Sequence, residues 1–156
     1  MSVQNLVLAL DASLQAEIGA KNKQIEMLER QEAAIAARDS DGLAEAARDL
    51  QAQLQREIDR AAKRAGIMAE LARSLGLPLP TRVGAIVDAL GPRGTALANR
   101  RAELRSRCAV ALRKGRHVAG LVRGHAALVE EALGRFLSPD PSGTPLGRGS
   151  LVDAEA

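Results

Sequence analysis

The sequence predicts an all-α protein with three long helices, one short connecting helix and a disordered C-terminal tail. Its 156 residues are 46% apolar, yet Phe136 is the only aromatic residue. In most globular proteins, aromatic side chains supply much of the buried area of the core. Ala, Leu, Val and Ile are most readily buried by close helix packing. Residues typical of strands are sparse, and the single Cys108 excludes an intramolecular disulfide.

The first two helices are expected at about residues 2–38 and 41–75, and their short connector predicts an antiparallel hairpin. Asp39 or Ser40 can cap the second helix. Apolar residues of the first helix recur every three or four positions, which marks one face. They are Val3, Val7, Leu10, Leu14, Ile18, Ile25, Leu28 and Ile35. The second helix repeats this alternation, which predicts close packing along one stripe. That stripe is Leu43, Ala47, Leu50, Leu54, Ile58, Ala61, Ala65, Met68, Ala72 and Leu75.

A short helix at residues 81–90 and a long one at 93–137 complete the predicted fold. Gly76 and Pro78 end the second helix, and the Gly91-Pro92 pair ends the short one. The last helix carries a stripe of Leu97, Leu104, Cys108, Ala111, Val118, Val122, His125, Val129, Ala132 and Phe136. A flanking row consists of Leu112, Leu121, Leu128 and Leu133. Two interpretations stay open: the bundle buries this whole wide face, or part of it is free for a partner helix.

Domain organisation follows from composition. Residues 1–137 are expected to form one helical bundle domain. Residues 138–156 are dense in Pro, Gly and Ser, which cannot form a core, so a disordered tail is predicted there.

The motifs that carry catalysis are absent from the sequence. It has no phosphate loop, no dinucleotide fingerprint and no nucleophile elbow. His117 and His125 are eight residues apart, whereas two metal ligands one helical turn apart need a spacing of three or four. The sequence therefore predicts a protein that is not an enzyme and that has no cofactor and no metal site.

Charge is distributed unevenly. Residues 93–124 hold nine Lys or Arg residues and one acidic residue, whereas residues 1–70 are net acidic. This basic block is interpreted as a match to the acidic first half of the bundle or to an acidic partner. A nucleic-acid surface is not favoured, because no aromatic residues interleave the block. Within the first helix, Glu17 with Lys21 and Glu26 with Arg30 have the spacing of helix-supporting pairs.

The N-terminus and the apolar runs bear on localisation. No run approaches the roughly 18 apolar residues of a membrane span. No basic segment precedes the apolar residues at the start, so a signal peptide is not expected. A cytoplasmic protein without membrane insertion is predicted.

Several stretches resemble the FlgN family of flagellar export chaperones. The hairpin is similar at residues 25–30, at 34–39 and at Gly42-Leu43, and the second helix ends similarly at residues 69–78. A short helix at 83–90 follows at the expected place. The last helix is similar from Leu121-Val122-Arg123 to Ala132-Leu133 and Phe136-Leu137, and a Pro/Ser/Gly-rich tail comes after it.

The resemblance implies a function. The chain would bind the helical ends of hook–filament junction proteins, also called hook-associated proteins, and keep them soluble for type III export. A client segment would lie as an amphipathic helix on the last helix. The client-binding residues would be Val118, Leu121, Val122, Leu128, Val129 and Leu133. Arg105, Arg113, Lys114 and Arg116 would steer an acidic client. Leu146, Gly147 and Arg148 stand where family tails carry an element that engages the export gate.

Two other classes of protein stay open. The first is a scaffolding coiled coil in which the last helix completes a homo-oligomer, and its solution mass would reveal this self-association. The second is a helical protein associated with nucleic acid, whose binding would depend steeply on salt.

Overall fold

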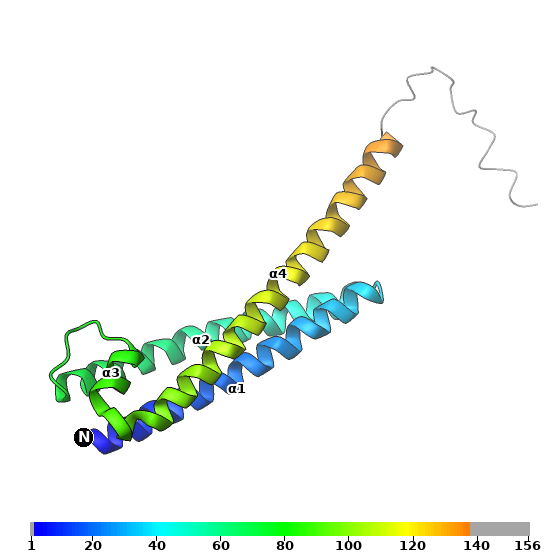
Figure 1. The fold of residues 1–156 in the computed structure, drawn as a ribbon. Helices are drawn as coiled ribbons and strands as arrows, with labels where there is room; N and C mark the ends of the chain where they lie inside the picture. The colour runs from blue at the N-terminus through cyan, green and yellow to red at the C-terminus, as the bar shows by residue number, and fades with distance from the viewer. Residues whose placement is uncertain (1, 138–156) are drawn as a thin grey trace, which may run out of the picture. The chain divides into compact units, whose positions relative to one another are not determined.

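The computed structural model describes residues 2–137 and contains every helix that the sequence predicts (Figure 1). Helix α1 spans Val3–Ala36, α2 spans Ser40–Ser74 and α3 spans Val83–Leu90. A 3₁₀ turn, η1, follows at Gly91–Gly94, and α4 spans Thr95–Leu137. No described residue lies in a β-strand. The predicted all-α class is confirmed, and the observed helix ends lie within two residues of the predicted ones.

Side-chain caps explain where α1 and α2 begin. The hydroxyl oxygen of Ser2 accepts a hydrogen bond from the Asn5 amide at 3.2 Å. The Asp39 carboxylate accepts one from the Gly42 amide at 2.9 Å. Each bond satisfies a backbone donor that has no partner inside the helix. Of the two residues predicted to cap α2, Asp39 does so, and Ser40 is the first helical residue.

The chain divides into two compact units, Met1–Leu121 and Val122–Ala156. The first unit holds α1, α2, α3, η1 and the part of α4 up to Leu121. In the second unit the structure describes α4 residues 122–137. The tail predicted at residues 138–156 lies outside the described residues, and the assignment of residues 1–137 to one domain stays a prediction.

Ion pairs define the directions of the long helices in the first unit. Lys21 pairs with Glu57 at 2.8 Å, and Arg30 pairs with Asp49 at 3.0 Å. Residue numbers thus rise along α1 as they fall along α2, and the two helices form the predicted antiparallel hairpin (Figure 1).

The first half of α4 lies along α1 in the parallel direction. Arg100 pairs with Asp11 at 3.4 Å, and Lys114 pairs with Glu29 at 2.9 Å. Because α1 and α2 are antiparallel, this part of α4 runs antiparallel to α2. The first unit is therefore an up–down–up arrangement of three helices.

A leucine-rich core joins all four helices at the end of the first unit that holds α3. Its buried members are Leu6, Leu10, Leu14, Leu71, Ile86, Leu90 and Leu97. Helix α3 contributes Ile86 and Leu90, which are buried, and Val83 and Val87, which pack against the cluster. No helix of the described residues has both the length and the apolarity that crossing a membrane requires.

The predicted packing stripe of α2 is only partly correct. Met68, Ala72 and Leu75 do pack inward. Leu54 and Ile58, in contrast, are 42% and 62% exposed. In their place α2 presents a neighbouring face to α1, and that face includes the buried Gln53, whose amide donates to the Ala20 carbonyl at 3.3 Å. A hydrogen-bonded polar side chain can occupy such an interface without a large desolvation cost.

Candidate partner-binding surface on α4

The apolar residues of α4 change from buried to exposed along the helix. Leu97, Ala111 and Val118 are buried within the first unit. Five of the six predicted client-binding residues come after Val118, and their side chains are between 36% and 66% exposed. These five are Leu121, Val122, Leu128, Val129 and Leu133.

The exposed apolar residues share one side of the helix. At 100° per residue, Leu121, Leu128 and Val129 fall within about half of the circumference. Arg123 and Glu131 fall on the other half. The second unit therefore presents a helix with a clear apolar face. Within that unit, residues 122–137 include no second helix that could cover it. We call this surface, made by Leu121 and the apolar residues of 122–137, the α4 apolar face.

Val118 has a different environment from the other predicted site residues. Its side chain is 5% exposed and lies in the first unit. It therefore helps to hold α4 on the bundle and is not accessible to a client.

Two exposed residues extend the α4 apolar face beyond the predicted set. Phe136 is 87% exposed and Leu137 is 80% exposed. Both lie on the same half of the helix as Val129 and Leu133 by their spacing. The sequence did contain a signal for Phe136, since it continues the apolar stripe and is the only aromatic side chain.

Four glycines lie in the middle and C-terminal parts of α4, namely Gly115, Gly120, Gly124 and Gly134. A Cβ added at any of them would meet no heavy atom within 4 Å. Within residues 2–137, none is therefore required for the close approach of another segment. Each weakens the helix by about 1 kcal/mol relative to alanine.

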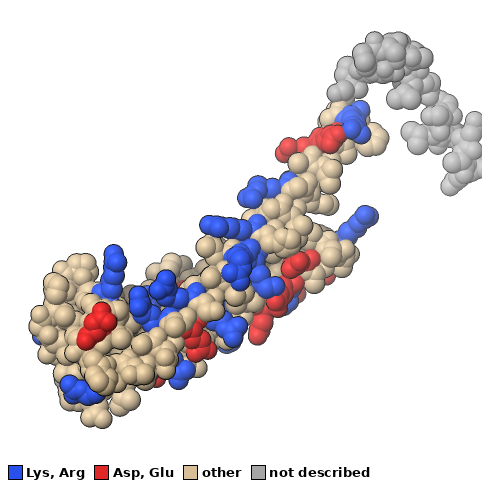
Figure 2. All heavy atoms as spheres, in the orientation of Figure 1, with Lys and Arg blue, Asp and Glu red and all other residues tan. Residues whose placement is uncertain are grey.

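The basic block contains both paired and unpaired cations. Lys114 donates to Glu29, and this hydrogen bond raises the pKa of the Lys114 ammonium above its usual value. His117 Nε2 lies 3.2 Å from Glu32 Oε1. Part of the block therefore matches the acidic side chains of α1, as the sequence indicated. Figure 2 shows the Lys and Arg side chains gathered along α4, with acidic side chains on α1 beside them.

The other three residues of the predicted steering set are more accessible. Arg105, Arg113 and Arg116 are exposed. None of the three forms an ion pair within residues 2–137. Their positive charge is therefore available to a partner.

Over residues 2–137, no three His, Cys, Asp or Glu side chains come together in a way that could hold a metal ion. Cys108 is a free, half-buried thiol. The tail residues Leu146, Gly147 and Arg148 lie outside the described residues.

These features define a class of protein: a small helical bundle whose long last helix ends in an open amphipathic face. The sequence model of the FlgN family, described as FlgN protein, matches residues 1–144. The match covers most of the chain, which therefore belongs to the FlgN family. No curated protein and no solved structure matches it.

Proposed function

We propose that this protein is a cytoplasmic export chaperone for flagellar proteins and that its clients are the hook–filament junction proteins. The observation that carries this proposal is the α4 apolar face in a chain of the FlgN family. Such a face suits the capture of a helix from another protein, with residues at spacings of three and four as anchors. The function is binding, and no chemical step is needed for it.

The client segment docks as an amphipathic helix on the α4 apolar face. Leu121, Val122, Leu128, Val129 and Leu133 supply the contact. Phe136 adds a large side chain that is almost fully exposed without a partner. Burial of apolar surface contributes about 25 cal/mol for each Å² removed from water. The same contact shields the client's own apolar residues, which keeps the client from aggregating before export.

Release of the client requires limited affinity, and Gly124 and Gly134 provide it. A helix weakened at two positions is incompletely ordered when free. Its ordering on binding then subtracts from the free energy of the contact. The complex can therefore dissociate when the client is transferred to the export machinery.

The basic residues guide the encounter. Arg105, Arg113, Lys114 and Arg116 raise the association rate of a client whose docking segment is acidic. Of these, Lys114 retains its bond to Glu29 in the free protein, so the three arginines contribute more.

The tail is proposed to contact the export gate. Leu146, Gly147 and Arg148 stand at the position of the corresponding element in similar tails. This contact would bring the loaded chaperone to the export machinery and leave α4 available for the client.

The first prediction tests the α4 apolar face directly. The native chain should retain a hook–filament junction protein during purification from the cytoplasm of flagellated cells. The Leu121→Asp, Leu128→Asp double variant should lose it, because two carboxylates would be desolvated in the contact. The matched control is Arg123→Asp, Ala127→Asp, which places two carboxylates on the polar side of the same turns and should retain the client.

Other results would replace the proposal. Recovery of only further copies of the chain would indicate a scaffolding homo-oligomer. Recovery of nucleic acid, with binding that falls steeply as salt rises, would indicate a helical protein associated with nucleic acid. Equal loss of the client in both double variants would show that helix stability, and not the α4 apolar face, governs binding.

A further inference from the structure

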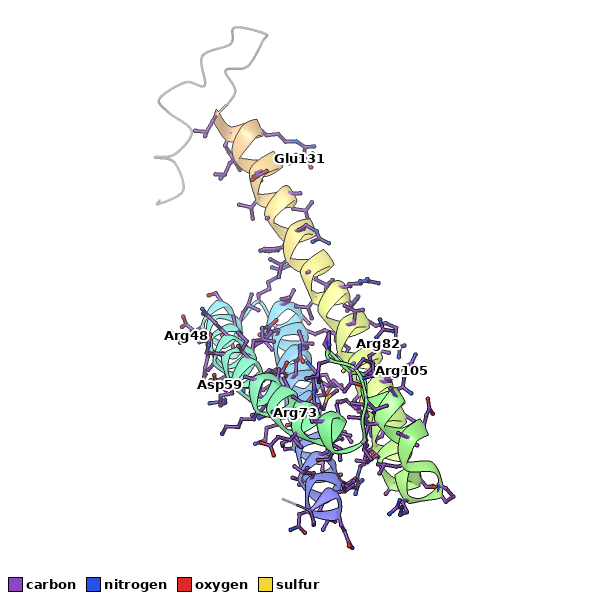
Figure 3. All side chains as sticks on the ribbon, turned by 90° about the vertical axis from the view of Figure 1, so that its left-hand side faces the viewer. Arg48, Asp59, Arg73, Arg82, Arg105 and Glu131 are labelled. Carbon is purple, nitrogen blue, oxygen red and sulfur yellow. The ribbon has the colours of Figure 1, made fainter. Side chains whose placement is uncertain are left out.

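A second apolar surface lies in the first unit, in a groove between α2 and α4 with α1 at its floor. One cavity of about 490 Å³ has Ala20 of α1, Ala61 of α2, and Leu104 and Cys108 of α4 among its lining residues, and its other lining residues are charged. In Figure 3, α1 is visible between the other two helices. The groove is formed entirely by residues of the first unit.

A second cavity continues the groove along α2. It has a volume of about 550 Å³ and shares Ala61 and Arg64 with the first. Its other walls include Ala65 and Met68 of α2 and Leu79 of the connector to α3. The two cavities therefore form one continuous depression.

Exposed apolar residues extend the groove at its other end. Leu54 and Ile58 belong to the same α2 stripe as Ala61, and both are exposed. On α4, the exposed Leu112 lies one turn beyond Cys108. Because α4 runs antiparallel to α2 here, Leu112 lies toward the Leu54 end. From Leu54 to Met68 the stripe is about 21 Å long at 1.5 Å per residue, which is about four helical turns. We call the whole surface the α2–α4 groove.

The charges around the α2–α4 groove are asymmetric. On the α2 side, Glu57 and Arg64 line the first cavity, and each is ion-paired with a residue of α1, namely Lys21 and Glu17. These charges compensate one another. They leave the α2 side of the groove close to neutral.

The opposite rim of the groove is basic. Arg105 lines the first cavity, and Arg101 lies one turn before it on α4. The Arg101 guanidinium lies over Gly84 of α3, about 3.4 Å from where a Cβ would stand. Arg82 follows Thr81, which lines the second cavity. Within residues 2–137 none of these three arginines forms an ion pair. Figure 3 labels Arg82 and Arg105, and both appear on the side of the view where α4 lies.

We propose that the α2–α4 groove binds one amphipathic helix of a partner protein, with acidic side chains along one flank. The apolar face of that helix packs on Ala61, Leu104 and Cys108, and its acidic flank meets Arg82, Arg101 and Arg105. A helix there adds a fourth member to a three-helix unit, which is a common packing arrangement. The neutral α2 side and the basic α4 side together set the direction of the bound helix. This site is separate from the α4 apolar face and does not depend on the proposed function.

The test uses the full chain and two designed peptides. One is a helical peptide of about 18 residues with a leucine stripe and glutamates on one flank. In the other, every glutamate is replaced by lysine. The acidic peptide should bind the native protein at least about tenfold more tightly, as expected for two or three exposed charge pairs. Fluorescence anisotropy of the labelled peptides measures both affinities.

Two variants locate the bound peptide. Ala61→Glu places a charge inside the groove and should abolish binding of the acidic peptide. Ala52→Glu, on the opposite side of α2 and also exposed, should leave binding unchanged. An Arg82→Glu, Arg101→Glu variant should reverse the preference and bind the lysine peptide. Arg105 is left intact because it also belongs to the proposed steering set.

Several results would overturn the proposal. These are no binding of either peptide, equal binding of both, or binding unaffected by Ala61→Glu. Loss of the acidic peptide in the Leu121→Asp, Leu128→Asp variant alone would assign the peptide to the α4 apolar face instead. Whether the Ala61→Glu variant retains a junction protein is measured separately. That measurement tests the proposed function, whereas peptide binding tests the α2–α4 groove, so failure of one can be distinguished from failure of the other.

Discussion

Leu8 and Leu10 of α1 are two positions apart and lie in opposite environments. Leu8 is 62% exposed, whereas Leu10 is 0% exposed and belongs to the core that joins the four helices. Truncation of a buried leucine removes its transfer free energy and leaves a cavity. The same truncation at the surface removes little.

The second prediction compares these two leucines. Leu10→Ala should lower the free energy of unfolding by about 2–5 kcal/mol. Leu8→Ala should change it by less than about 0.5 kcal/mol. Urea denaturation followed by circular dichroism at 222 nm measures both values. A similar loss for the two variants would contradict the assignment of the core.

Ion pairs show what residue spacing cannot predict. From the sequence, Glu17 with Lys21 and Glu26 with Arg30 were expected to pair within α1. In the structure Glu17 pairs with Arg64 and Lys21 with Glu57, both across the hairpin. Spacing identifies charges that are neighbours in one helix, but it carries no information about which side chains a second helix brings near.

At the scale of the helices, ends were easier to predict than faces. Asp39, Gly76 and Pro78 mark ends through local backbone chemistry, which acts over a few residues. The face of α2 that packs on α1 depends on the partner helix. There the buried Gln53 is satisfied by Ala20, while the apolar Ile58 stays outside.

For the candidate site too, local features could be predicted and features that depend on other helices could not. The apolar half of the last helix could be predicted from spacing alone, but spacing left open which of its residues are exposed. The burial of Val118 could not be predicted from spacing, because it depends on which residues of α4 pack against other helices within the first unit. The α2–α4 groove could not be predicted either, since it needs the positions of three helices.

The third prediction concerns the glycines of α4. Gly124→Ala and Gly134→Ala should each stabilise the helix by about 1 kcal/mol, because nothing lies within 4 Å of the added methyl group. The helical content, measured by circular dichroism at 222 nm, should rise. A junction protein should dissociate more slowly, since less ordering accompanies its binding.

Gly94→Ala is the contrasting substitution. There the new Cβ would lie 2.8 Å from the Val87 carbonyl oxygen, so the first unit should lose thermal stability. If Gly124→Ala and Gly134→Ala left helicity unchanged, the segment would already be fully ordered, and its proposed role in client release would be wrong.

Stability should be distributed unevenly between the two units. The first has a core of seven buried residues contributed by four helices. In the second, the described helix has no core of its own. Helices of this length are marginal in water without tertiary packing. Local opening therefore costs little free energy in residues 122–137 and much more in the helices of the first unit.

The last prediction uses amide hydrogen exchange to separate the two proposed sites. In the free protein, amides of residues 122–137 should exchange much faster than those of residues 97–111. A bound junction protein should slow exchange in residues 122–137, because client contacts replace the missing core. The acidic peptide should instead slow exchange around residues 54–68 and 104–112. Slow exchange of residues 122–137 in the free protein would mean that another surface already covers the α4 apolar face, and client binding would then require its displacement.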